Sequence, residues 1–229
     1  GGKGLTNPTQ NLADAFGMAN GKGINEPGSG YDEDHPYVGR DPRFYMTFAY
    51  DGSEFTVNDK TQTIETFEGG KDATATNKTA TKTGYYLKKL LSPQAVWDGR
   101  TNNITRTWIL MRYAEVLLNA AEAAVELSLA SVSSPDGTDM LSVATKAIND
   151  IRERAGAQLL TASLTGTTDS RDIVRKERRK ELAFEHKTKW DLRRWRVNHY
   201  EGRDGFWGEQ RNKAVSYTHL RAHETVLDL

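Results

Sequence analysis

The apolar residues in the second half of the chain recur at helical spacing. A first set predicts a long helix over residues 107–131, with one face formed by Leu110, Ala114, Leu117, Ala121 and Ala124/Val125. A second set predicts another helix, which Gly156 ends, with its apolar face at Leu141, Ala144, Ile148, Ile151 and Ala155. The short linker between the two predicts a helical hairpin, the unit of helical-repeat proteins.

A third helix is predicted over residues 169–187, with Asp169 or Ser170 as its N-cap. This helix opens a strongly charged segment. Residues 171–196 hold eleven Lys or Arg against five Asp or Glu, and glutamates recur every four residues at 177, 181 and 185. At that spacing acids and bases lie one turn apart and pair, so the segment favours an ion-paired helix over a nucleic-acid surface.

The first half has a different pattern, in which turns containing Pro or Gly separate short apolar runs. It predicts a short helix over residues 9–18 and a second one with Asp41 as N-cap and Pro42 at the first helical position. Two short strands, residues 53–57 and 61–67, are joined by Asn58 and Asp59. Residues 71–83 hold almost no large apolar side chain and predict an exposed loop.

Composition narrows the classes of function. The chain has 229 residues, 31 basic and 31 acidic side chains and no cysteine. Because the net charge is zero, the overall charge gives no reason to expect a nucleic-acid or anionic-membrane partner. The lack of cysteine excludes disulfides, cysteine nucleophiles, Fe–S clusters and thiolate zinc sites. No apolar stretch approaches the roughly 18 residues that a membrane span needs.

Catalytic and metal-binding motifs are missing from the sequence. The acidic run from Asp32 to His35 lacks calcium-loop spacing, because its twelfth position is Arg43 rather than a glutamate. There is no Gly-x-Ser-x-Gly, no His-Glu-x-x-His and no phosphate-binding glycine loop. The sequence therefore predicts no enzyme, no cofactor and no metal site.

Aromatic residues stand among polar turn residues in the first half of the chain. Flat aromatic faces stack on sugar rings, while nearby Asp, Asn and Arg side chains bond to hydroxyl groups. The loop around Trp97, Asp98 and Arg100 offers both kinds of group. We expect ligand contacts at these three residues and at Tyr37. The alternative is that the aromatics pack the loops onto the helical core.

Several motifs, in a fixed order, carry a family resemblance. Upstream they are NPTQNLADAF (7–16), DPRF (41–44) and TGYYLKK (83–89); downstream they are RYAEVLLNAAEA (112–123), INDIRERAG (148–156) and ERRKELAFE with DLRRW (within 173–195). Over residues 7–213 the chain thus resembles the C-terminal part of the SusD/RagB family of outer-membrane nutrient-binding lipoproteins.

The resemblance implies a mainly α-helical fold, with tetratricopeptide-like helix pairs packed against a loop-rich part that contains short helices and a few short strands. It places the loop-rich part at residues 1–104 and the helical part at 105–213. It implies non-catalytic capture of glycans or peptides at the outer-membrane surface. The ligand then passes to a SusC-type TonB-dependent transporter.

Two departures from the family lead to further expectations. The N-terminal lipid anchor and some scaffold helices are missing from the chain, which predicts a fragment with an apolar face meant for its neighbours. Residues 214–229 match nothing in the family and resemble translated sequencing adapter, which predicts a non-native tail; a genuine divergent C-terminus is the alternative.

The alternative to glycan capture is a helical-repeat module that binds only other proteins. A third function to be tested is polysaccharide hydrolysis.

Overall fold

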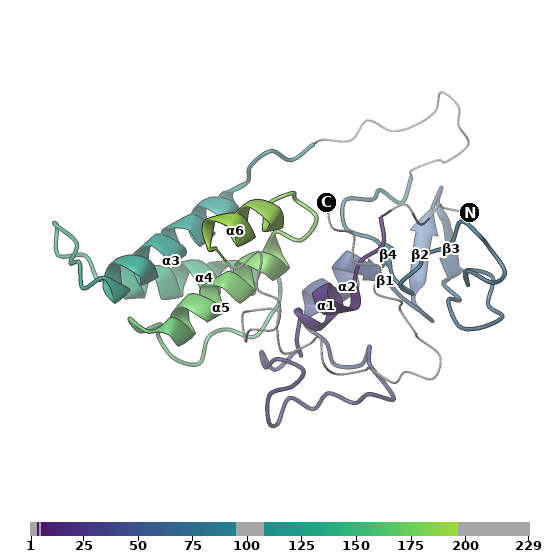
Figure 1. Ribbon diagram of the computed structural model, residues 1–229, viewed down its shortest axis with the longest axis horizontal. Helices are drawn as coiled ribbons and strands as arrows, with labels where there is room; N and C mark the ends of the chain where they lie inside the picture. The colour runs from purple at the N-terminus through teal and green to yellow at the C-terminus, as the bar shows by residue number, and fades with distance from the viewer. Residues whose placement is uncertain (1–3, 5, 95–107, 197–229) are drawn as a thin grey trace.

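A computed structural model describes residue 4 and residues 6–94 and 108–196 (Figure 1). Helices α3 to α6 gather at one end of the molecule, and the short helices and strands of the first half lie at the other. The prediction of a mainly helical fold with a loop-rich part is confirmed. The expected boundary at residues 104 and 105 falls outside the described residues. In the described part, no helix is long and apolar enough to cross a membrane.

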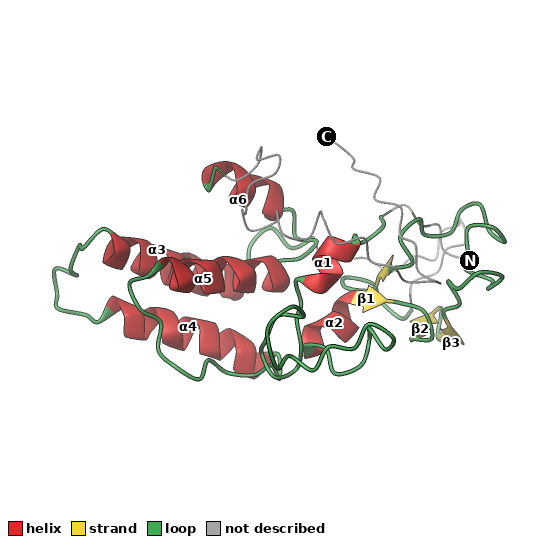
Figure 2. Cartoon of the chain, turned by 60° about the horizontal axis from the view of Figure 1, so that its bottom comes forward, coloured by secondary structure: helices red, strands yellow, loops and turns green. Residues whose placement is uncertain are grey.

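The helical part is built on the predicted hairpin. Helix α3 (Tyr113–Leu129) and helix α4 (Met140–Arg154) lie side by side, and α5 (Thr168–Glu181) packs against α3 (Figure 2). Their shared core consists of small and branched side chains, chiefly Leu118, Ala121, Val125, Ala144, Ile148, Ile151 and Val174. Gly156 follows α4 with a φ of 66°, the left-handed conformation that glycine accepts at a helix end.

Helix α3 begins later than its apolar pattern predicted. Residue 107 lies outside the described part, and Arg112, immediately before α3, has extended dihedral angles, with φ −144° and ψ 161°. The extended backbone directs the Arg112 guanidinium at the carboxylates of Glu181, the last residue of α5, and Glu185, just after it. Lys187 fixes the preceding turn by donating to the Leu110 carbonyl at 2.9 Å. Tertiary contacts thus override the local helical spacing.

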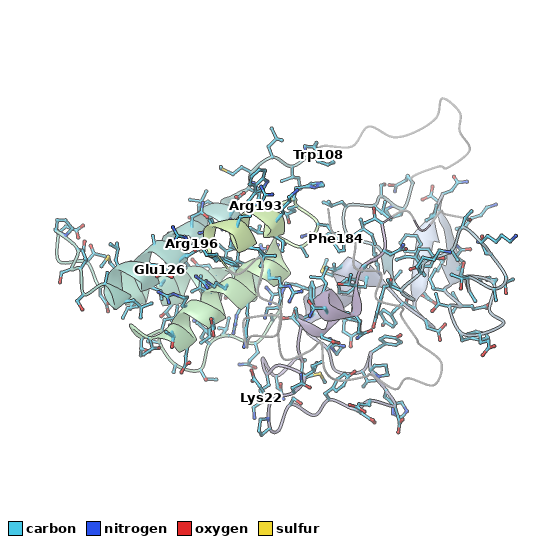
Figure 3. All side chains as sticks on the ribbon, viewed as in Figure 1. Lys22, Trp108, Glu126, Phe184, Arg193 and Arg196 are labelled. Carbon is cyan, nitrogen blue, oxygen red and sulfur yellow. The ribbon has the colours of Figure 1, made fainter. Side chains whose placement is uncertain are left out.

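The third predicted helix is shorter than expected, and the sequence did not predict the short helix that follows residue 187. Helix α5 ends at Glu181, and α6 (Thr188–Arg194) starts after a bend in which Phe184 and His186 have positive φ angles of 63° and 59°. The bend places Phe184 at the boundary between the two parts of the molecule (Figure 3). The N-cap of α5 is Thr167 and neither predicted residue, since its hydroxyl accepts from the Ser170 amide.

The loop-rich part follows its local sequence signals closely. Asp41 caps α2 (Pro42–Thr47) with proline at the first position, as predicted. Thr9 caps α1 (Gln10–Asp14), which ends before the predicted limit at residue 18. Strands β2 (Glu54–Val57) and β3 (Lys60–Thr63) form the predicted hairpin. Asn58 and Asp59 both have positive φ, as a type I′ turn requires. The second sheet pairs β1 (Phe48–Ala49) with β4 (Tyr86–Leu87) in antiparallel register.

An aromatic core fills the loop-rich part and reaches into the helical part. It comprises Ala13, Phe16, Phe44, Phe48, Tyr85 and Ala183, and the last of these follows α5. The loop at residues 71–83 is less exposed than predicted. Ala73, Ala80, Thr81 and Thr83 are buried, and the Thr81 hydroxyl donates to the Tyr85 carbonyl, just before β4, at 2.6 Å.

Candidate functional site

Three half-buried tyrosines form a cluster on the loop-rich part, which we call the tyrosine cluster: Tyr37, Tyr45 and Tyr50. The Tyr37 and Tyr50 ring centroids are 4.3 Å apart, and Tyr45 lies 6.2 Å from Tyr50. The Tyr45 hydroxyl donates to the Tyr37 carbonyl at 2.7 Å. These contacts hold the three partly exposed residues against one another.

Arg40 positions the loop that carries Tyr37. Its side chain is only 1% exposed and donates to the carbonyls of Ala13, Gly17 and Pro36 at 2.6, 3.0 and 2.8 Å. The guanidinium also lies over the Phe44 ring, 4.5 Å from its centroid. By bonding these three carbonyls, the buried Arg40 side chain joins the chain at residues 13–17 to the chain at residue 36. The loop tip, Asp32 to His35, is exposed.

Glu177 is the centre of a buried ion-pair network that joins the two parts of the molecule. Its carboxylate accepts from Arg43 of α2 at 2.5 Å and from Arg152 of α4 at 2.9 Å. Lys180, on the next turn of α5, lies 3.5 Å away. Arg43 also pairs with Asp41, the N-cap of α2, at 2.8 Å. One carboxylate of α5 therefore connects the loop-rich part with α4.

Glu181 and Glu185 extend the network toward the start of α3. Arg112 donates to Glu181 at 2.6 Å and to Glu185 at 2.7 Å. Arg154 donates to Glu181 at 2.5 Å, and Lys89, just after β4, donates to Glu185 at 2.6 Å. The predicted ion pairing is present, but most of these pairs connect different elements instead of running along one helix. The network holds the scaffold together and offers no free catalytic group.

Acid should weaken the fold through Glu177. Burial on its own would raise the pKa of Glu177, but Lys180, Arg43 and Arg152 lower it to about 2, against an ordinary value of 4.5. A lowered pKa means that the folded chain binds this proton less readily than the unfolded chain. The stabilisation is therefore complete above about pH 4.5 and is lost as the pH falls toward about 2.

Urea unfolding between pH 7 and pH 3 measures this effect. The free energy of unfolding should decline on the acid side, and the decline should be shallower in Glu177→Gln, which has no carboxylate at this position to protonate. Equal acid-side slopes in the two proteins would contradict the assignment.

A cavity of about 290 Å³ opens between the start of α3 and the end of α4. Its lining combines apolar and charged side chains, namely Arg112, Tyr113, Ala114, Leu117, Asp150, Ile151 and Arg154. Asp150 is paired with Lys146 at 2.6 Å. Among the described residues, no group of three or more His, Asp or Glu side chains is arranged to hold a metal ion.

Of the four predicted ligand contacts, the structure describes one. Tyr37 is half-buried in the tyrosine cluster, where it packs on Tyr50 and Phe44. Trp97, Asp98 and Arg100 lie outside the described residues, so the ligand role of all four stays a prediction. Sequence reasoning missed Arg40, because a lone arginine before Asp41 gives no periodic signal that it turns inward.

The comparisons with known proteins agree on one family. The sequence model of the SusD family matches residues 1–226, a range that includes most of the tail. A SusD-like protein from Bacteroides fragilis is 32% identical, with a TM-score of 0.63; the match covers 84% of this chain and 36% of that one.

A second Bacteroides fragilis protein is described as a SusD-like carbohydrate binding protein. It is 28% identical over 87% of this chain and 37% of its own, with a TM-score of 0.62. The chain thus spans little more than a third of the length of these relatives. No curated protein matches it.

Proposed function

Because the chain belongs to the SusD family, we propose that it binds oligosaccharides and does not cleave them. The observation that carries the proposal is the family match, together with a matched relative described as carbohydrate binding. The tyrosine cluster is consistent with it, since Tyr37 and Tyr50 are partly exposed aromatic residues packed against each other, and aromatic rings can stack on sugars. The proposed ligand contacts are this cluster and, from the sequence, Trp97, Asp98 and Arg100.

The proposal extends to a cellular role at the outer-membrane surface. The bound glycan, or a peptide in its place, passes to a SusC-type TonB-dependent transporter, and a lipid anchor on the native protein holds it at the membrane. The family assignment supports this role.

A glycan panel titrated against the purified native protein tests the proposal. Saturable binding to at least one oligosaccharide, with no release of reducing ends, is the expected result. Reducing-end release would favour the hydrolase. Binding to no member of the panel would favour a module that binds only proteins.

Replacing Trp97 with alanine should weaken glycan binding about 5- to 30-fold. Loss of one aromatic stacking contact costs about 1–2 kcal/mol, which corresponds to that range of affinity. Isothermal titration with the best glycan of the panel measures it. Trp190→Ala is the matched control, because Trp190 is 62% exposed on α6, in the helical part. Unchanged affinity in Trp97→Ala, or an equal loss in Trp190→Ala, would contradict this assignment.

A further inference from the structure

Residues 182–187, which we call the α5–α6 bend, have an unusual backbone. Phe184 and His186 both have left-handed φ angles, 63° and 59°, although neither residue is a glycine. A residue with a side chain adopts this conformation only at a cost in free energy, and the conformation persists where the surrounding structure imposes it. Two such residues so close together indicate a bend whose shape is set by its contacts with the rest of the molecule.

Lys89, just after β4, holds the α5–α6 bend from the side of the loop-rich part. Its ammonium group donates to the carbonyls of Glu181 and Ala183, both at 2.9 Å. It also donates to the Glu185 carboxylate at 2.6 Å. An ammonium group has three protons to donate, and here each has an acceptor. Lys89 thus fixes the chain immediately before and immediately after Phe184.

The segment before α3 holds the α5–α6 bend from the side of the helical part. Arg112 donates to the Glu181 carbonyl and to the Glu185 carboxylate, both at 2.7 Å. The Trp108 ring stacks on the His186 ring with a centroid distance of 5.1 Å. Contacts from two segments that are distant in the sequence therefore meet at the bend, and together they impose its left-handed residues.

The α5–α6 bend directs Phe184 into the loop-rich part (Figure 3). The Phe184 ring is half-buried against the aromatic core and meets the Phe48 ring edge-on, with a centroid distance of 6.4 Å and an interplanar angle of 79°. The preceding residue, Ala183, belongs to the same core. Phe184 is thus the aromatic ring that the helical part contributes to this core.

From Phe48, ring contacts lead on to the tyrosine cluster. The Phe48 centroid lies 5.1 Å from that of Phe44, which lies 5.4 Å from that of Tyr50. Ring pairs about 4.5–7 Å apart attract each other in tilted and edge-on arrangements. Tyr50 in turn packs on Tyr37. Phe44 and Phe48 are fully buried, and protein interiors leave little empty space into which such rings could turn. A change at Phe184 should therefore reach Tyr50.

We propose that Phe184 is a positioning residue for glycan binding, through which the α5–α6 bend sets the arrangement of the tyrosine cluster. The proposal rests on the proposed function, because it takes the tyrosine cluster as a ligand contact. Phe184 acts through Phe48 and Phe44 and needs no contact with the glycan. The helical part then contributes to glycan affinity as well as to the scaffold.

Three variants of the native protein separate positioning from ordinary core stability. Phe184→Leu removes the ring but keeps an apolar side chain. Lys89→Met removes the hydrogen bonds that fix the bend and replaces no aromatic residue. Val174→Ala is the control, because Val174 is only 1% exposed in the separate core of α3 to α5. Its truncation should destabilise the helical part without changing the bend.

Isothermal titration with the best glycan of the panel is run at a temperature where circular dichroism shows every variant folded. Phe184→Leu and Lys89→Met should bind about threefold more weakly or worse, a usual size for coupling through packed side chains. Val174→Ala should bind as the unchanged protein does. Unchanged affinity in Phe184→Leu or in Lys89→Met would overturn the proposal. So would an equal loss in Val174→Ala, which would assign the effect to stability alone.

Fluorine NMR of protein labelled with fluorotyrosine gives a second readout that needs no ligand. Tyr50→Phe identifies the Tyr50 resonance, whose chemical shift depends on the neighbouring Tyr37 ring. This resonance should move in Phe184→Leu and stay in place in Phe55→Leu, a control on β2 outside the aromatic core. An unmoved Tyr50 resonance in Phe184→Leu would overturn the proposal. If no glycan binds to the unchanged protein, the proposed function fails, whereas a moved resonance still supports the positioning role of Phe184.

Discussion

Replacing Glu177 with alanine should lower the free energy of unfolding by about 3–5 kcal/mol, the usual cost of removing one partner from a buried ion pair. Glu177 is fully buried and is the shared partner of Arg43, Arg152 and Lys180. Without it, Lys180 retains only Asp41, at 3.8 Å, as a carboxylate partner in the described part. Because Glu177 joins α2 to α4, its loss should also let the loop-rich part and the helical part separate more easily.

Urea denaturation followed by circular dichroism measures the loss. Glu153→Ala is the matched control: it removes an exposed glutamate from α4 and should change stability by no more than about 0.5 kcal/mol. A loss below about 1 kcal/mol in Glu177→Ala would mean that solvent or neighbouring carboxylates compensate the cations, and the network would not be the main connection between the two parts.

Replacing Arg40 with alanine should cost about 3 kcal/mol and also reduce glycan binding. The variant removes three charge-assisted hydrogen bonds and leaves the carbonyls of Ala13, Gly17 and Pro36 without that donor. The loop that carries Tyr37 then loses the Arg40 side-chain contact with α1. The tyrosine cluster should become mobile, so glycan affinity should fall even though Arg40 is too deeply buried to touch a ligand.

Thermal unfolding and glycan titration of the same preparations separate the two effects. Arg193→Ala, which removes an exposed arginine from α6, should leave both quantities within error of the unchanged protein. If Arg40→Ala is destabilised but binds the glycan normally at a temperature where it is folded, the tyrosine cluster does not contribute to the site.

The sequence predicted the elements that depend on local chemistry. Asp41 and Pro42 begin α2 as expected, because a capping carboxylate and a fixed φ need no tertiary partner. Asn58 and Asp59 form their turn for the same reason. The break after Glu181 was not predicted. It depends on Arg112 and Lys89, which lie 73 and 96 positions from Glu185 and hold its carboxylate beside the end of α5.

The candidate site was predictable only in part. Aromatics among turn residues drew attention to Tyr37, but its pairing with Tyr50 arises from the fold of the loop around Arg40. Helix α3 also leaves Tyr113, Val116 and Leu127 exposed, at positions outside the apolar face that the sequence predicted. Sequence periodicity describes how apolar a helix is on each face, whereas packing decides which of two apolar faces is covered.

Hydrogen exchange of the native protein with and without a saturating oligosaccharide addresses glycan capture by the loop-rich part most directly. Bound glycan should slow exchange at residues 31–50 and 95–100 and leave α3 to α5 unchanged, because the proposed contacts lie in the loops. Slowing confined to α3 and α4, or no slowing at any residue although the glycan is bound, would contradict the account.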